Sequence, residues 1–208
     1  MSDKPLQIIR HRVNRISDLA AVRPEWGVEM DLRSDPRRPG HLYVAHDPWV
    51  EGDDFEAWLT EYVARGIQGP LILNTKEDNL ETRVLELLQK HGVRNHFFLD
   101  TALPTLVKWT QFQGRREFAV RLSKFEPVES CLPFAGKADW VWVDCFEGNP
   151  MVDADSLSAI DRLKAAGFRV CLVSPELQGQ PIGRVAEFAP LRARADAVCT
   201  KQPQAWTG

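Results

Sequence analysis

Two carboxylates and two histidines stand out because their types and spacing would suit acid–base and metal chemistry. Glu29 and Asp31 lie two residues apart in an apolar run, residues 28–32, that is typical of a buried strand. Since side chains alternate along a strand, both carboxylates should point to the same face. Unpaired buried charge is costly, so two acids on one face indicate a bound cation or a cationic partner. His11 precedes this run and His46 follows it, and histidine can donate or accept a proton near neutral pH.

A second pair of polar residues repeats the same spacing. Asn74 and Lys76 are also two residues apart, at the end of another apolar run, and should share one face. Because Mg²⁺ and Ca²⁺ prefer oxygen ligands, the favoured interpretation is that Glu29 and Asp31 hold a divalent cation. The alternative is that they form ion pairs with nearby basic residues such as Arg12 or Lys76 and have no further role.

Eight apolar runs along the chain are typical of strands, and helical patterns lie between them. The runs show little polar alternation, which suits parallel strands buried on both faces. They cover residues 6–10, 28–32, 71–74, 97–99, 118–122, 140–143, 169–173 and 195–199. Strands that alternate with helices in this way predict an α/β fold, a single small (β/α)8 TIM barrel.

The competing architecture is an open, doubly wound sheet. That fold usually begins with a glycine-rich phosphate-binding turn after its first strand. The first run here is followed by His11-Arg12-Val13-Asn14, which contains no glycine, so we expect the barrel. Further expected elements are an extra strand at 42–45, helices beginning at Asp53 and Asp78, helices over 104–112, 153–167 and 185–191, and a weak helical pattern at 123–137.

The active site of such a barrel lies at the carboxyl ends of its strands. The polar residues expected there are His11 and Arg12, Glu29 and Asp31, Asn74 and Lys76, Arg121 and Ser123, Asp144, Ser174, and Thr200 with Lys201. Arg121, Asp144 and Trp142 are candidates for a pocket wall, although Trp142 also suits barrel packing and Asp144 suits a helix cap or an ion pair. The remaining histidines are expected to be structural: His41, His91 and His96.

The composition is that of an ordinary globular chain of 208 residues, which we interpret as one domain over residues 1–208. With 26 basic and 29 acidic side chains, the net charge of −3 gives no field to attract nucleic acid. No apolar run has membrane-spanning length, and residues 1–5 lack the apolar stretch of a signal peptide. Four cysteines without a Cys-x-x-Cys pair should be reduced core residues. We therefore expect a cytoplasmic protein with a small-molecule substrate, and the oligomeric state stays open.

Five short motifs occur in order along most of the chain. They are His11-Arg12, Gly27-Val28-Glu29-Met30-Asp31, Val44-Ala45-His46-Asp47, Asn74-Thr75-Lys76 and Cys199-Thr200-Lys201-Gln202-Pro203. Together they resemble the His-Arg, Gly-x-Glu-x-Asp, His-Asp, acid-x-Lys and Thr-Asp-x-Pro motifs of the glycerophosphodiester phosphodiesterase family and its relative sphingomyelinase D. The chain differs from the family in having Val13 for a glycine, Asn74 for the third acidic metal ligand, Lys201 for the closing Asp, and no insertion after the second histidine.

This resemblance implies a metal-assisted phosphodiesterase of lipid metabolism. Its substrate would be a glycerophosphodiester or a lysophospholipid-type diester, and its cofactor Mg²⁺ or Ca²⁺. Attack by a hydroxyl of the substrate itself would give a cyclic phosphate, which fits the lack of a Gly-x-Ser-x-Gly nucleophile motif. The implied roles are acid–base catalysis by His11 and His46, metal binding by Glu29, Asp31 and Asn74, and phosphate binding by Arg12 and Lys76.

Three other functions stay open on the sequence. Loss of the acids at Asn74 and Lys201 is compatible with a non-catalytic barrel that binds a phosphoester. A metal-free phosphodiesterase could use a basic side chain in place of the cation. A Schiff-base aldolase using Lys76 ranks lowest, because neighbouring carboxylates would keep this amine protonated.

Overall fold

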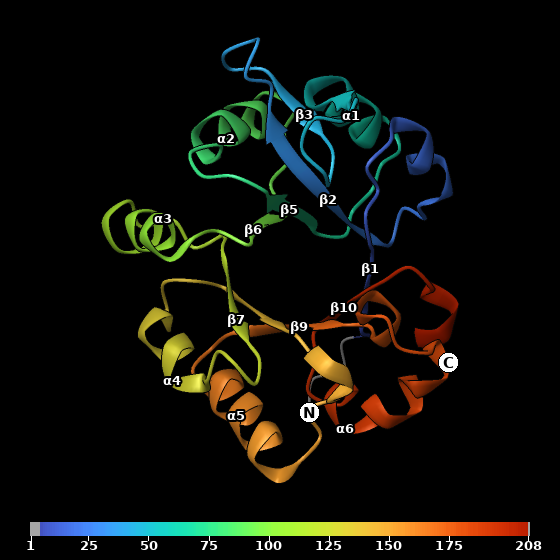
Figure 1. Cartoon of the computed structure of the whole chain (residues 1–208), viewed down its shortest axis with the longest axis vertical. Coiled ribbons are helices and arrows are strands. Elements are labelled where there is room, and N and C mark those ends of the chain that lie inside the picture. Colours follow the sequence, from blue (N-terminus) through green and yellow to red (C-terminus); the bar gives the residue numbers. More distant parts are fainter. Residues whose placement is uncertain (1–4, 208) are drawn as a thin grey trace. The chain divides into compact units, whose positions relative to one another are not determined.

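The computed structural model describes residues 5–207, and these form two compact units (Figure 1). One unit is Arg10–Val107. The other combines the chain up to Ile9 with the part from Lys108 onward. The predicted absence of a signal peptide concerns mainly residues 1–4, which lie outside the described residues.

A five-stranded sheet forms the centre of the Arg10–Val107 unit, in the order β4-β3-β2-β5-β6. Its strands β2 (Gly27–Ser34), β5 (Leu71–Thr75) and β6 (His96–Leu99) are parallel, with Asp31 opposite Asn74 and Asn74 opposite Leu99. Two short antiparallel strands follow: β3 (Leu42–Val44) pairs with the last three residues of β2, and β4 (Asp53–Asp54) pairs with β3. The carboxyl ends of β2 and β5 therefore lie side by side.

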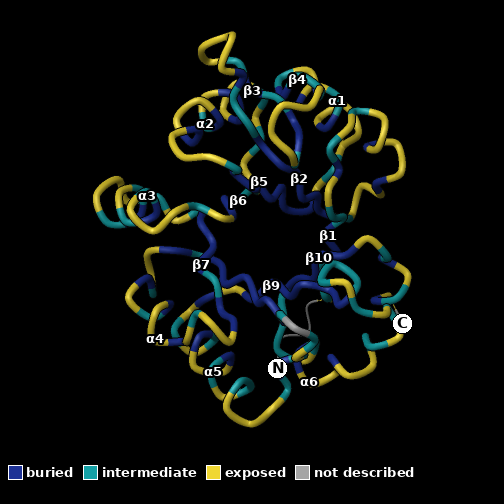
Figure 2. Tube along the Cα trace, in the orientation of Figure 1, coloured by how far each residue is buried: buried dark blue, intermediate teal, exposed yellow. Residues whose placement is uncertain are grey.

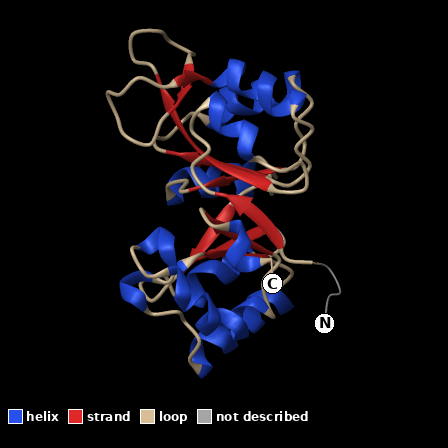
Figure 3. Cartoon of the chain, turned by 90° about the vertical axis from the view of Figure 1, so that its right-hand side faces the viewer, coloured by secondary structure: helices blue, strands red, loops and turns tan. Residues whose placement is uncertain are grey.

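Helices lie against this sheet (Figure 3), and α1 and α2 each bury apolar side chains. The short 3₁₀ helix η1 (Ile16–Ala21) precedes β2, and α1 (Phe55–Ala64), α2 (Glu81–Lys90) and α3 (Leu103–Val107) follow β4, β5 and β6. The predicted start of α1 at Asp53 is one residue early, because the Asp54 side chain caps the helix by accepting the Ala57 N–H at 2.7 Å. The predicted start of α2 at Asp78 is also early, because Asn79 has a left-handed φ of 71° that no helix accommodates.

The other unit contains β1 (Gln7–Arg10, except its last residue) and four parallel strands in the order β10-β9-β8-β7. The strands are β7 (Ala119–Leu122), β8 (Trp140–Val143), β9 (Arg169–Val173) and β10 (Ala197–Thr200), and each pairs in parallel with the next. Its longest helix, α5 (Ala154–Ala165), begins where predicted, with Asp153 accepting the Ser156 N–H at 2.9 Å.

The remaining helices of this unit are short and irregular. They are α4 (Val128–Cys131), α6 (Ala189–Arg192) and 3₁₀ segments, of which η6 (Ile182–Phe188) covers most of the helix predicted at 185–191. Prolines explain this shortening: Pro181 immediately precedes η6 and Pro190 lies at the start of α6, and proline cannot continue a helical hydrogen-bond ladder. The helix predicted at 104–112 changes from α3 to a π-helical turn at Lys108–Phe112.

The core of each unit follows its strands, which are dark in Figure 2, while the outer surfaces of the helices are exposed. All four cysteines are buried and free, as predicted. Burial raises the pKa of the Cys131 thiol to about 11 and that of Cys145 to about 12. No helix in the described part of the chain is long and apolar enough to cross a bilayer. The prediction of an α/β fold with parallel strands is confirmed.

Candidate active site

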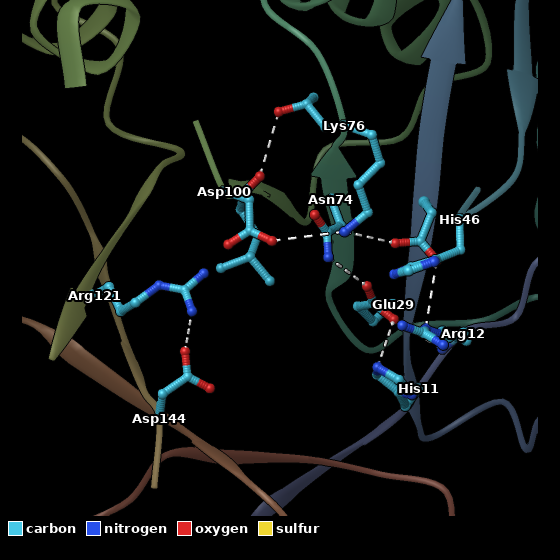
Figure 4. A network of polar contacts seen from close by, with 12 residues as sticks. His11, Arg12, Glu29, His46, Asn74, Lys76, Asp100, Arg121 and Asp144 are labelled. Carbon is cyan, nitrogen blue, oxygen red and sulfur yellow. Dashed lines mark hydrogen bonds and ion pairs between the residues drawn. The ribbon is translucent and has the colours of Figure 1, made fainter. Parts of the chain in front are cut away.

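The Arg10–Val107 unit brings most of the predicted site residues together (Figure 4). His11 and Arg12 directly follow β1, Glu29 and Asp31 point from β2, and Asn74 and Lys76 end β5. The Trp58 indole N–H donates to the Val13 carbonyl at 3.1 Å, and the Val13 N–H donates to the Glu29 carbonyl at 2.9 Å. These bonds fix the segment after β1 against β2.

Glu29 is a buried carboxylate with neutral hydrogen-bond donors. It is 1% exposed, and its Oε2 accepts the backbone N–H of Arg12 at 2.8 Å while its Oε1 accepts from Asn74 Nδ2 at 3.1 Å. His11 Nε2 lies 3.7 Å from Oε2, an ion-pair distance once the imidazole is protonated. Burial, and secondly the Asp31 charge, raise the pKa of Glu29 to about 7. This carboxyl can therefore change its protonation near neutral pH.

Asp31 is fully buried and, unlike Glu29, has charged partners at close range. Lys76 Nζ lies 3.0 Å from its Oδ1, and Arg12 Nε lies 3.9 Å from its Oδ2. Asn14 Nδ2 donates to Oδ2 at 2.7 Å and Asn14 Oδ1 accepts the Asp31 N–H at 3.0 Å. Sequence reasoning assigned no role to Asn14, whose only signal was its place beside the His-Arg pair.

His46 is the second residue of the connection between β3 and β4. Arg33 holds its carbonyl oxygen with Nε at 3.1 Å and Nη2 at 2.7 Å, and the Ala45 N–H donates to the Asp31 carbonyl at 3.1 Å. The imidazole Nδ1 lies 2.8 Å from Asp47 Oδ1, which leaves Nε2 for other contacts. The connection is therefore fixed beside the carboxyl end of β2 and presents one orientation of the ring.

Backbone strain occurs within the same cluster. Arg12 has a left-handed φ of 51°, although it is not a glycine. The conformation is held by its N–H bond to the buried Glu29 carboxylate. Non-glycine residues in this region cost about 1–3 kcal/mol and gather at functional sites.

Later residues of the same connection border an open groove of about 670 Å³ lined by residues from 35–38, 43 and 49–52. Trp49 is 86% exposed at this groove, has a φ of 67°, and is followed by the exposed Val50. Arg37 and Arg38 also line the groove, and both contact the Asp35 carboxylate. An exposed tryptophan beside arginines suits a ligand with both an apolar and an anionic part.

The cluster does not match the divalent-cation site that the family resemblance implies. Among residues 5–207, no group of three or more His, Cys, Asp or Glu side chains is placed to hold a metal ion. Asn74 turns its amide N–H, not its oxygen, toward Glu29, and Lys76 already lies on Asp31. The Asn74 Oδ1 atom is buried and has no hydrogen-bond partner within the described chain.

The remaining candidates, Arg121, Asp144 and Trp142, lie in the other unit. Arg121 forms a close ion pair with Asp144, whose second oxygen accepts from Gln178 Nε2 at 3.1 Å (Figure 4). Trp142 is buried on β8 in register with Arg121 on β7. Of the alternatives left open for Asp144, an ion pair is realised, with Arg121 as a partner.

Comparison with solved structures identifies the fold. A candidate glycerophosphodiester phosphodiesterase from Galdieria sulphuraria matches with a TM-score of 0.74 and 12% identity, over 99% of this chain and 98% of that one. A glycerophosphodiester phosphodiesterase from Agrobacterium tumefaciens matches with a TM-score of 0.70 and 14% identity, over 97% and 98%. The chain has the fold of the glycerophosphodiester phosphodiesterases.

This fold also occurs in a protein with a different description. A glycerol uptake operon antiterminator-related protein from Thermotoga maritima matches with a TM-score of 0.55 and 14% identity, over 99% of this chain and 100% of that one. No protein-family sequence model matches the chain, and no curated protein is significantly similar to it in sequence. The comparisons therefore establish the fold of the chain and nothing finer.

Proposed function

We propose that this protein is a phosphodiesterase that acts on glycerophosphodiesters or lysophospholipid-type diesters. The observation that carries the proposal is the cluster in the Arg10–Val107 unit: a buried acid pair, Glu29 and Asp31, beside His11, Arg12 and Lys76 at the ends of parallel strands. The fold shared with glycerophosphodiester phosphodiesterases supports it.

Phosphate binding falls to the two basic side chains of the cluster. Arg12 presents a planar guanidinium whose side chain is 40% exposed, and Lys76 presents a compact ammonium. A phosphodiester carries one negative charge that becomes concentrated on its non-bridging oxygens during attack. Arg12 would hold two of its oxygens in a fork, and Lys76 would add a point charge.

Proton transfer falls to His11 and His46. A base has to deprotonate the attacking hydroxyl, and an acid has to protonate the leaving oxygen. Glu29 at 3.7 Å stabilises a protonated His11, and Asp47 at 2.8 Å orients the ring of His46. Each histidine therefore has a carboxylate partner that suits a residue cycling between neutral and charged forms.

The attacking group would be a hydroxyl of the substrate next to the phosphoester, which gives a cyclic phosphate. Such a hydroxyl is already positioned, so little orientational entropy is lost. Asn74 Oδ1, buried and without a partner in the described chain, offers an acceptor for a substrate hydroxyl. No protein nucleophile is needed in this route.

Two finer predictions belong to this proposal. The first is that residues 1–208 form one closed (β/α)8 barrel, which is supported by single matches that cover 97–99% of the chain. The second is the divalent cation, which would stabilise phosphoryl oxygens as a Lewis acid when bound. Because Asn74 turns its amide N–H toward Glu29 and Lys76 already lies on Asp31, none of the roles above depends on it.

A substrate screen tests the proposal. Glycerophosphodiesters and lysophospholipids would be incubated with the protein in Mg²⁺, in Mn²⁺, in Ca²⁺ and in chelator, and products followed by phosphorus NMR. We expect turnover of diesters with a free vicinal hydroxyl and none of the same diesters methylated at that hydroxyl. Equal turnover of both would show direct attack by water, and no turnover of any diester would contradict the proposal.

The second candidate is a non-catalytic barrel that binds a phosphoester. The match to the antiterminator-related protein over the full length of both chains favours keeping it. Calorimetry separates the two functions: a binding protein should retain a glycerophosphodiester unchanged, whereas the enzyme should release products. A Schiff-base role for Lys76 is disfavoured, because its Nζ is held in an ion pair with the Asp31 carboxylate at 3.0 Å.

A further inference from the structure

Lys76 lies between two carboxylates from different strands. Its Nζ is 3.0 Å from Asp31 Oδ1 on β2 and 3.7 Å from Asp100 Oδ2, directly after β6 (Figure 4). Its backbone N–H donates to the Leu32 carbonyl at 3.1 Å, so the residue is tied to β2 as well. The side chain is only 16% exposed. A lysine held at both ends and largely buried is a fixed charge, not a mobile surface group.

Asp100 is placed for this contact by local backbone geometry. Leu99 pairs in register with Asn74 on the neighbouring strand, so Asp100 begins where the strand pairing ends. It has a left-handed φ of 61°, which aspartate tolerates better than most residues. The chain turns at this point, and the carboxylate meets Lys76 from the side opposite to Asp31's strand, because β5 lies between β2 and β6.

Two carboxylates flank the Lys76 ammonium, as carboxylates flank a bound metal ion. A cation that bridges Asp31 and Asp100 would have to occupy the space where Nζ now lies, since its bonds to oxygen are only about 2.0–2.6 Å long. Arg12, 3.9 Å from the other Asp31 oxygen, adds a second positive charge. Together the two basic side chains balance the two carboxylates that Lys76 contacts, so a divalent ion would gain little from this environment.

We propose that the Lys76 ammonium is the built-in cation of this site, that Asp31 and Asp100 position it, and that phosphoesters bind here without a divalent metal. This rests on the proposed function only in taking a phosphoester as the ligand. Asp100 is a positioning residue, because it acts on the ligand through Lys76. The ammonium would face a non-bridging phosphate oxygen in the place of the metal.

The first experiment measures binding of ions and of phosphoester separately. Calorimetric titration of the full chain with Mn²⁺, Mg²⁺ and Ca²⁺ should show no binding up to millimolar concentrations. Titration with glycerol 3-phosphate, used as the probe, should give the same affinity in chelator and in Mg²⁺. Submillimolar binding of any of these ions, or an affinity for the probe that falls tenfold in chelator, would overturn the proposal.

The second experiment removes the ammonium and asks whether a metal can replace it. Lys76→Ala should weaken probe binding at least tenfold and create a Mn²⁺ site between the Asp31 and Asp100 carboxylates. Mn²⁺ should then restore probe binding in this variant. Asp100→Asn in the Lys76→Ala background should abolish the new Mn²⁺ site, because one carboxylate of the bridge is lost.

Matched variants separate this result from general damage. Lys90→Ala removes a surface lysine that pairs with Glu56, and it should change neither probe affinity nor Mn²⁺ binding. Lys76→Arg keeps the charge and should bind the probe without Mn²⁺, which covers the case in which Lys76→Ala fails to fold. Unchanged probe binding in a folded Lys76→Ala protein would overturn the proposal. A failed substrate screen would overturn the proposed function but leave these binding results interpretable.

Discussion

Buried carboxylates lie at strand ends in both units of the chain, and the two sets differ in what neutralises them. Asp144, after β8, pairs directly with the Arg121 guanidinium and also accepts from Gln178. Glu29, on β2, has the backbone N–H of Arg12 and the amide of Asn74 as its close donors, and its pKa is raised to about 7. Both residues are nearly inaccessible to water.

This difference in partners should decide whether each carboxylate changes its protonation when a ligand binds. A buried carboxylate with a full counter-charge keeps the same ionisation whatever enters the site. One held by neutral donors gains or loses its proton when a charge such as a phosphate or a protonated histidine comes close. We therefore expect variants around Asp144 to act on stability and variants around Glu29 to act on chemistry.

The largest effect on turnover is expected for the two candidate proton-transfer histidines. His11→Ala and His46→Ala should each lower turnover of a reactive diester by roughly 10²–10⁴-fold, because each removes a proton-transfer group. His41→Ala and His96→Ala are the controls. His41 pairs with Asp54 at 3.1 Å and His96 contacts the Phe98 ring, so both should leave turnover nearly unchanged. Comparable losses in all four variants would contradict the assignment.

The next largest effect is expected on stability, when the ion pair between Arg121 and Asp144 is broken. Arg121→Met should lower the free energy of unfolding by about 3–5 kcal/mol, because it leaves Asp144 buried without its counter-charge. Adding Asp144→Asn should recover much of that loss. Urea unfolding followed by circular dichroism measures both. An Arg121→Met variant as stable as the wild-type protein would contradict a stabilising role for this ion pair.

Substitution of Glu29 should raise the free energy of unfolding, whereas substitution of Arg121 should lower it. Its folded-state pKa of about 7 lies above the ordinary value of 4.5, so between these pH values the folded protein binds the proton more tightly than the unfolded chain. Its contribution to stability is therefore lost as the pH rises from 4.5 through 7. Glu29→Gln should remove this dependence and stabilise the protein above pH 7 by on the order of 1–3 kcal/mol. Unfolding temperatures measured from pH 4 to 8 should diverge in that window; parallel curves would show that Glu29 stays ionised.

The strands and the acid pair were predictable because they depend on local pattern. Strand alternation alone places Glu29 and Asp31 on one face, and apolar runs without alternation predict the parallel strands. The partners of the charges were not predictable in the same way. Asp100 meets Lys76 only through the register of β5 and β6 and a left-handed backbone, and Arg121 meets Asp144 across 23 residues of chain. An acid directly after a strand-like run was the one signal that pointed to Asp100.

The smallest effect is expected for a substitution at the groove lined by Trp49, which should change substrate preference and not the rate of the chemical step. Trp49 is exposed in a left-handed conformation, and neither feature benefits the folded chain on its own. Its ring would cover the apolar part of a lysophospholipid, whereas a glycerophosphodiester with a small polar group would not reach it. Trp49→Ala should therefore raise KM roughly 3–10-fold, about 1 kcal/mol, for a lysophospholipid and leave KM for the small diester unchanged. Turnover at saturation should stay the same for both, because the proton-transfer groups are intact. Equal changes in KM for the two substrates would mean that the groove does not select between them, and a lower maximal rate would mean that Trp49 positions His46 instead.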